Sequence, residues 1–94
     1  MTFGSPTTTR TELPPSTDRT DLLIFYAPDI EPGSFRARLN GREASGRFHP
    51  YKGWREVVRI PLVPGDNRLD LSIKGRIDRK RRTEKLRLTF AVAK

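Results

Sequence analysis

Residues 57–74, VVRIPLVPGDNRLDLSIK, carry the most constraining pattern in the chain: apolar and polar residues alternate on both sides of a turn signal. A period of two gives a strand one buried face and one solvent-exposed face. Between the two halves, Pro64 presets φ, Gly65 tolerates a positive φ, and Asp66 and Asn67 can hydrogen-bond to nearby backbone. The stretch therefore predicts two strands joined by a turn as a β-hairpin.

Further strands are predicted on the N-terminal side of this stretch. The apolar run at residues 22–27 is rich in β-branched and aromatic residues, which favours a strand. After a turn at residues 29–34, residues 35–39 alternate and place Arg36 and Arg38 toward solvent. Asn40-Gly41 is typical of a type I′ turn, because both central residues of that turn have positive φ. A third strand is therefore expected within residues 42–48.

The last segment, residues 86–92, alternates again and predicts a closing strand. No helical period of useful length occurs anywhere in the sequence. Six or seven short strands, with turn signals about every ten residues, favour an all-β fold, a small antiparallel β-sandwich. A small closed barrel is the alternative.

The first twenty residues have a different composition from the rest. They contain seven Thr, two Ser and three Pro, and their two Arg are balanced by two acidic residues. So little apolar surface cannot offset the entropy lost on ordering. We therefore expect residues 1–20 to be a disordered tail or linker, and residues 21–94 to form one domain.

The net charge of +8 favours polyanionic partners such as nucleic acid, anionic glycans or an acidic membrane surface. The chain contains no Cys, which excludes disulfides and thiolate zinc sites. It shows neither an apolar run long enough to cross a membrane nor the pattern of a signal peptide.

The segments 32–41, PGSFRARLNG, 58–69, VRIPLVPGDNRL, and 86–92, LRLTFAV, together resemble bacterial immunoglobulin-like modules. They are similar in particular to the B domain of glucodextranase and to fibronectin-like repeats. The resemblance implies an immunoglobulin-like sandwich that acts as a spacer or binding appendage of an exported, often carbohydrate-active protein. It also implies an extracellular or periplasmic location if the chain is part of such a protein. The basic residues before the last strand depart from the short acidic or Gly-Asn turn of many such modules.

Residues 74–87 hold eight basic and two acidic residues. Guanidinium groups suit phosphate and sulfate oxygens, so a basic loop at residues 78–85 could bind a polyanion. The alternative is a solvated loop that only keeps a small domain soluble. The predicted partner-binding residues are Arg36, Arg38, Arg79, Lys80, Arg81, Arg82, Lys85 and Arg87.

Residues 47–55, RFHPYKGWR, mix aromatic and basic residues and predict an exposed loop. Aromatic rings in such a loop could stack on bases or sugar faces while the cations hold an anionic backbone. The only Trp of a small sandwich more often fills its core, so we expect Trp54 to be buried and His49 and Tyr51 to be exposed. All three are stacking candidates.

Asp29 and Glu31 could meet Asp66 or Asp78 and offer oxygen ligands to calcium, but their spacing matches no known calcium loop. Solvated or turn-stabilising acids are the favoured interpretation, so no metal or cofactor is expected. The single His precedes a Pro, and the sequence lacks Cys, a nucleophile elbow and a glycine-rich phosphate loop. We therefore expect no enzymatic activity.

These observations favour a non-catalytic accessory or interaction domain that presents basic loops to a protein or an anionic polymer. The alternative is a nucleic-acid-binding β-domain that uses the hairpin at residues 74–87 for phosphate and the loop at residues 47–55 for stacking. A third hypothesis is edge-strand pairing, in an otherwise monomeric protein, with a partner or a second copy.

Overall fold

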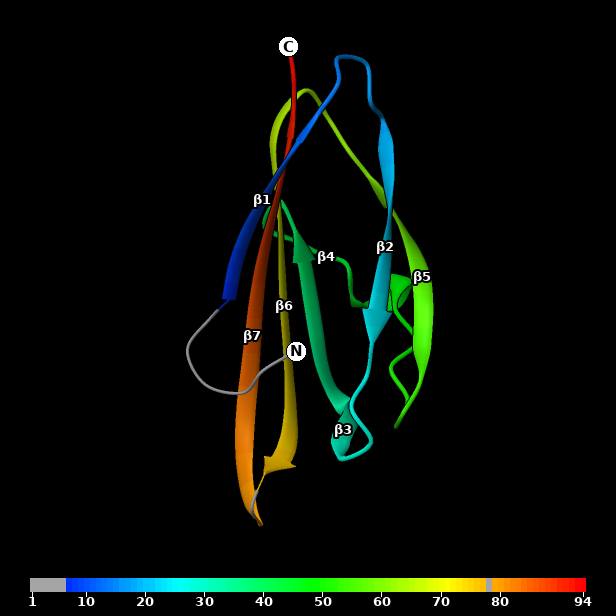
Figure 1. Ribbon diagram of the computed structural model, residues 1–94, viewed down its shortest axis with the longest axis vertical. Helices are drawn as coiled ribbons and strands as arrows, with labels where there is room; N and C mark the ends of the chain where they lie inside the picture. The colour runs from blue at the N-terminus through cyan, green and yellow to red at the C-terminus, as the bar shows by residue number, and fades with distance from the viewer. Residues whose placement is uncertain (1–6, 78) are drawn as a thin grey trace.

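The structure of the protein, a computed structural model, describes residues 7–77 and 79–94, and its strands form two sheets (Figure 1). The five-stranded sheet has the order β1-β7-β6-β3-β4, and β2 and β5 form the second sheet. A small all-β fold, as predicted, is confirmed. The strands are β1 (Thr7–Leu13), β2 (Arg19–Phe25), β3 (Ile30–Leu39), β4 (Arg42–Glu43), β5 (Arg55–Pro61), β6 (Gly65–Ile77) and β7 (Lys80–Val92), and η1 (Ser45–Arg47) is a 3₁₀ helix.

The core consists of the apolar faces of the strands, as the alternating pattern predicted. Val58 and Ile60 of β5 are buried, and so are Leu69, Leu71 and Ile73 of β6. The polar residues between them face solvent or lie half-buried at the surface. Burial of these side chains is the main driving force for packing the two sheets together.

The predicted hairpin at residues 57–74 is wrong, although both of its strands exist. β5 pairs with β2, whereas β6 pairs with β3 and β7. The turn at Pro64–Asn67 therefore carries the chain from one sheet to the other. The alternating pattern determines which face of a strand is buried, but it does not determine the partner strand.

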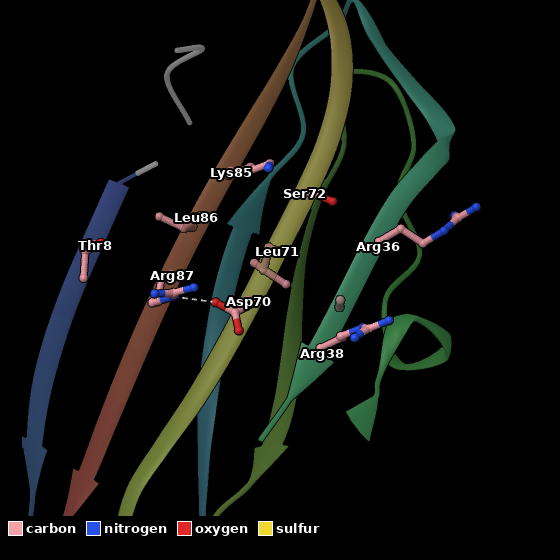
Figure 2. Close-up of a pocket in the computed structure, with 10 residues that line it drawn as sticks. Thr8, Arg36, Arg38, Asp70, Leu71, Ser72, Lys85, Leu86 and Arg87 are labelled. Carbon is pink, nitrogen blue, oxygen red and sulfur yellow. Dashed lines mark hydrogen bonds and ion pairs between the residues drawn. The ribbon is translucent and has the colours of Figure 1, made fainter. Parts of the chain in front are cut away.

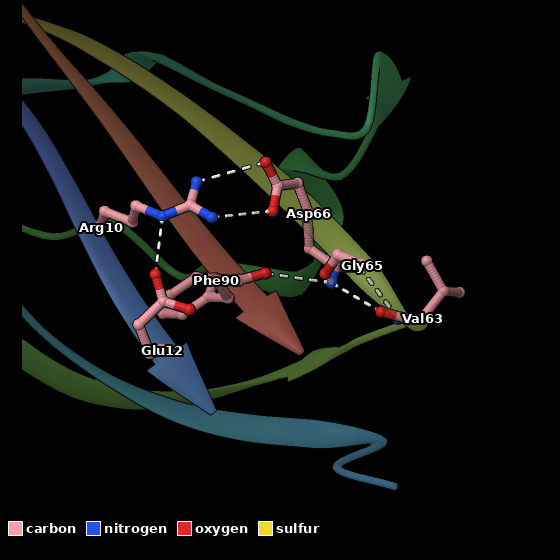
Figure 3. Close-up of polar contacts among 7 residues, drawn as sticks. Arg10, Glu12, Val63, Gly65, Asp66 and Phe90 are labelled. Carbon is pink, nitrogen blue, oxygen red and sulfur yellow. Dashed lines mark hydrogen bonds and ion pairs between the residues drawn. The ribbon is translucent and has the colours of Figure 1, made fainter. Parts of the chain in front are cut away.

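Asn67 stabilises this crossing. Its buried side chain donates to the carbonyl oxygens of Val63, Gly65 and Phe90 and accepts from the Val63 N–H, at 2.8–3.2 Å (Figure 3). Gly65 has a φ of +92°, which an L side chain rarely adopts. The turn chemistry in the sequence therefore serves a connection between sheets.

The predicted disordered tail extends too far into the chain. β1 pairs in parallel with Leu86–Val92 of β7, and β2 already begins at Arg19. The Arg10 guanidinium also contacts the carboxylates of Glu12, at 2.8 Å, and Asp66, at 3.2 Å (Figure 3). The tail prediction is wrong for β1 and the start of β2, because backbone pairing along an edge needs little apolar surface; residues 1–6 lie outside the described residues.

The predicted basic loop at residues 78–85 is mostly strand. β6 continues to Ile77 and β7 begins at Lys80, so a tight turn joins two long strands. Arg79 in that turn has a φ of +66°, and Asp78 lies outside the described residues. Like charges along the strands are tolerated because alternate side chains point to opposite faces.

The Asn40-Gly41 turn is confirmed, since the φ angles are +52° and +81°. The strand after it contains only Arg42 and Glu43 and is followed by η1, so it is much shorter than the range 42–48 allowed. β3 begins at Ile30, within the predicted turn at residues 29–34, and its register with β6 shifts between Glu31 and Arg36. Among the described residues, no helix is long and apolar enough to cross a membrane.

Candidate functional site

The outward face of the five-stranded sheet brings together four of the predicted partner-binding residues. Arg87, Asp70 and Arg38 lie opposite one another in one cross-strand row on β7, β6 and β3. Lys85, Ser72 and Arg36 form the next row. Because neighbouring strands are about 4.8 Å apart, Lys85 and Arg36 are attached roughly 10 Å apart, on either side of the small Ser72.

These two rows line a hollow of about 310 Å³ on the sheet surface (Figure 2). Thr8 of β1 completes one side of it, so four adjacent strands contribute. The polar and charged residues that line the hollow are Thr8, Arg36, Arg38, Asp70, Ser72, Lys85 and Arg87. The hollow therefore holds four cations and one carboxylate.

That carboxylate is already paired. Asp70 accepts from Arg87 at 2.8 Å (Figure 2). It also lies 3.3 Å from the Arg68 guanidinium. Within residues 7–77 and 79–94, no carboxylate is within ion-pair distance of Arg38 or Lys85. The hollow thus has cations whose charge is not neutralised in direct contact.

Arg36 is held in place by the backbone. Its Nη1 donates to the carbonyl oxygens of Phe35, at 2.7 Å, and Gly33, at 3.2 Å. A guanidinium fixed in this way loses less side-chain entropy when it binds an anion. Arg36 therefore acts as a preorganised donor at one edge of the hollow.

The other four predicted residues, Arg79, Lys80, Arg81 and Arg82, lie at the end of the β6–β7 hairpin and are exposed. Arg81 forms a bidentate ion pair with Glu31, at 2.7 and 2.9 Å. This contact lowers the pKa of the Glu31 carboxyl and raises the pKa of Arg81. The sequence placed all eight residues on one basic surface, but the structure divides them into two groups.

A second cleft, of about 550 Å³, lies next to the hairpin end. The residues that line it include Lys74 and Arg81 of the hairpin, Glu31 and Ser34 of β3, and Lys52 of the aromatic loop, residues 47–55. Lys52 lies between Tyr51 and Trp54 in sequence, so part of the predicted stacking loop adjoins the basic hairpin.

Trp54 is 53% exposed, so the prediction that it fills the core is wrong. Phe48 is buried instead and packs against Phe35, whose ring also contacts Tyr26. Three smaller rings fill the space that a Trp would need. Tyr51 is 67% exposed, and the His49 side chain also faces solvent.

Glu56 anchors the aromatic loop and was missed in the sequence. It accepts from the Tyr26 hydroxyl at 2.8 Å and from the His49 backbone N–H at 2.7 Å, and it lies 3.2 Å from His49 Nδ1. The sequence did contain a signal: in the alternating pattern Glu56 falls on the same inward face as Val58 and Ile60, and an acid at a buried face needs hydrogen-bond partners. His49 thus has a structural contact, whereas Tyr51 and Trp54 keep exposed rings.

Burial, followed by the hydrogen bond to Glu56, raises the pKa of Tyr26 well above its ordinary value of 10.0. The folded state therefore keeps the phenol protonated at a pH where the unfolded state ionises. Because of this group, the free energy of unfolding should not change with pH below about pH 10 and should fall as the pH rises above it. Thermal unfolding measured from pH 8 to pH 11.5 should show this loss, and Tyr26→Phe should reduce it while the exposed control Tyr51→Phe should not; equal pH dependence in both variants would contradict the assignment.

Two of the four predicted calcium ligands pair with arginines, Glu31 with Arg81 and Asp66 with Arg10, and Asp78 lies outside the described residues. In the described part of the chain, no three His, Cys, Asp or Glu residues are grouped so that they could hold a metal ion.

No protein-family model matches this chain. No curated protein is significantly similar to it in sequence. No solved structure matches it significantly either. The resemblance to bacterial immunoglobulin-like modules therefore stays a prediction.

Proposed function

We propose that the protein is a non-catalytic interaction domain that binds an anionic polymer on the outward face of its five-stranded sheet. The observation that carries this proposal is the hollow lined by Arg36, Arg38, Lys85 and Arg87. Its cations come from β3 and β7, which both pair with β6 between them, so the sheet fixes their spacing. The basic surface is thus mainly strand rather than the loop expected from the sequence.

The chemistry of the hollow favours phosphate or sulfate groups. Guanidinium forks can bind two oxygens of such a group at once, and the Ser72 hydroxyl between Arg36 and Lys85 can donate a further hydrogen bond. Along the strands, the next outward residues are also basic or polar, including Arg68 and Lys74. A polymer with repeated anionic groups could therefore contact the hollow and its neighbours together, each contact releasing counterions.

The test is a binding titration with the double variant Arg38→Gln/Lys85→Gln. These two residues have no ion-pair partner among the described residues, so the variant should keep the fold. The quantity to measure is the fluorescence anisotropy of a labelled sulfated glycan fragment at roughly 0.15 M salt, where weak long-range attraction is screened. The dissociation constant should rise about tenfold or more, since charge-assisted hydrogen bonds are lost.

The matched control is Arg19→Gln/Arg55→Gln, which removes the same charge from exposed positions on the two-stranded sheet. We expect at most about a twofold change for this control, because it alters only the long-range field. If both variants weaken binding equally, only the net charge matters and the hollow is not the site. Absence of glycan and oligonucleotide binding at this salt concentration by the original protein would also refute the proposal.

A second candidate function is the binding of single-stranded nucleic acid at the hairpin end. The observation that favours it is the second cleft, where Lys52 joins Lys74 and Arg81 beside a loop with two exposed rings. The same titration with a labelled oligonucleotide separates the two. Stacking predicts that the oligonucleotide, but not the glycan, quenches Trp54 fluorescence. It also predicts that Tyr51→Ala weakens binding of the oligonucleotide and leaves binding of the glycan unchanged. Unchanged Trp54 fluorescence would contradict this candidate function.

A further inference from the structure

The outward face of the two-stranded sheet has an apolar centre. Leu23 of β2 lies opposite Val57 of β5, and Phe25 follows on the same face of β2. All three side chains are more than half exposed, at 53%, 63% and 56%. Contiguous exposed apolar side chains of this kind commonly mark an interaction surface.

This face is self-complementary. Three of the four cross-strand rows on this face pair Asp21 with Arg59, Leu23 with Val57, and Phe25 with Arg55, always with the first residue on β2. The fourth row pairs Arg19 with Pro61 at one end of the face. A two-fold axis parallel to the strands, placed between two copies, lays β2 of each copy over β5 of the other and keeps the rows aligned. Asp21 then faces Arg59 of the second copy, Leu23 faces Val57, and the Phe25 ring faces Arg55.

Each of these contacts is favourable for a different physical reason. Asp21 and Arg59 are 3.5 Å apart within one copy, and both side chains are mostly exposed, so each can also bind across an interface. Leu23 and Val57 would bury apolar surface, and Arg55 over Phe25 is a cation–π contact. Face-to-face sheets with strands aligned in this way are a common packing arrangement.

The net charge of +8 does not prevent this association. The cations of the hollow lie on the opposite sheet, facing away from this surface. The face between two copies would hold opposite charges in register at one end and apolar groups in its centre. A second copy therefore supplies a favourable contact in each of these three rows, whereas a strongly acidic partner would place negative charge next to Asp21.

We propose that the outward face of β2 and β5 is a weak homodimer interface with two-fold symmetry. Two strands of seven residues cover a face only about 23 Å long, so the buried area falls at the small end of specific interfaces. The dissociation constant should accordingly be on the order of 100 µM. This proposal is independent of the anion-binding function, which uses the opposite sheet.

Sedimentation equilibrium of the full chain from about 10 µM to 1 mM, a range that brackets the expected constant, tests the proposal. Leu23→Lys and Val57→Lys should each raise the dissociation constant about tenfold or more, because each places a charge in the apolar centre. The control is Val63→Lys, since Val63 is 56% exposed but lies in the connection after β5. It should leave the mass distribution unchanged.

A mixing experiment tests the geometry itself. Asp21→Arg and Arg59→Asp should each abolish self-association, because like charges then face each other across the interface. An equimolar mixture of the two variants should associate, since every cross-interface contact again joins opposite charges. Neither variant regains an Asp–Arg pair within its own chain, so association of the mixture must come from contacts between the two variants.

The proposal is overturned if the original protein is monomeric throughout the concentration range, or if the mixture of charge variants does not associate. It is also overturned if Val57→Lys leaves the dimer intact, because that outcome would indicate edge-strand pairing. Circular dichroism of each variant confirms that the fold is retained, and the charge variants supply the test if an apolar-centre variant does not fold.

Discussion

Removing residues 1–13 is expected to unfold the domain. The truncated chain, starting at Pro14, loses all seven residue pairs of the β1–β7 ladder and exposes the edge of the longest hairpin. It also loses the contact of Leu13 with the core. At about 1 kcal/mol per backbone hydrogen bond, the loss is of the same order as the total stability of a small domain.

Thermal unfolding followed by far-UV circular dichroism measures this effect. The truncated chain should show no cooperative transition, or one far below that of the full chain, and it should tend to aggregate through the exposed β7 edge. Adding a synthetic peptide of residues 7–18 should restore part of the transition. Removal of Lys94, an exposed residue after β7, is the control; an unchanged melting temperature after removal of residues 1–13 would mean that β1 contributes nothing.

Asn67→Ala is expected to be the most damaging single substitution. Asn67 is 0% exposed, and its amide satisfies backbone groups of Val63, Gly65 and Phe90. Alanine leaves several of these buried groups without partners, each at a cost of about 1–3 kcal/mol. The loss of unfolding free energy should be about 3 kcal/mol or more, which lowers the melting temperature by roughly 12 °C or more.

Asp66→Ala is the matched control for this substitution. Asp66 is the preceding residue in the same connection, but its carboxylate is exposed and, within residues 7–77 and 79–94, binds only the exposed Arg10 guanidinium. Exposed ion pairs contribute little to stability, so its melting temperature should change by only a small fraction of the shift in Asn67→Ala. Equal effects in the two variants would show that the turn backbone, rather than the Asn67 amide, stabilises the crossing.

The sequence was sufficient to predict which face of most strands is buried. The alternation of Val58 and Ile60, and of Leu69 and Leu71, depends only on each strand's own residues and was correct. The Asn40-Gly41 turn was also predictable, because its positive φ angles restrict the residues that fit. These features are local, and local patterns are what a single sequence records directly.

Pairing between strands could not be predicted in the same way. The short connection between β5 and β6 favoured a hairpin, but the partner of each strand depends on the whole core. β1 was missed because its Thr-rich sequence buries little apolar surface and is held by backbone pairing and by Arg10. Trp54 was misplaced because Tyr26, Phe35 and Phe48 fill the space between the sheets first.

The candidate site could be predicted from the sequence only in part. Alternation places Arg36, Arg38 and Arg87 toward solvent, so their exposure followed from the sequence. Their proximity depends on the order β7-β6-β3, which the sequence pattern did not contain. The separation of the hairpin end from the hollow followed from the length of β6 and β7, and the charge pattern alone suggested one continuous loop.

The parallel pairing of β1 with β7 has a mechanical consequence. Thr7 begins one strand beside Leu86, and Val92 ends the other beside Leu13. Tension between residue 7 and the end of β7 therefore acts along the strands and slides them past each other. All bonds of the ladder share that load at once, in shear, instead of opening one after another as in an unzipped hairpin. The edge strand thus makes the domain most resistant to force applied along the line between these two points.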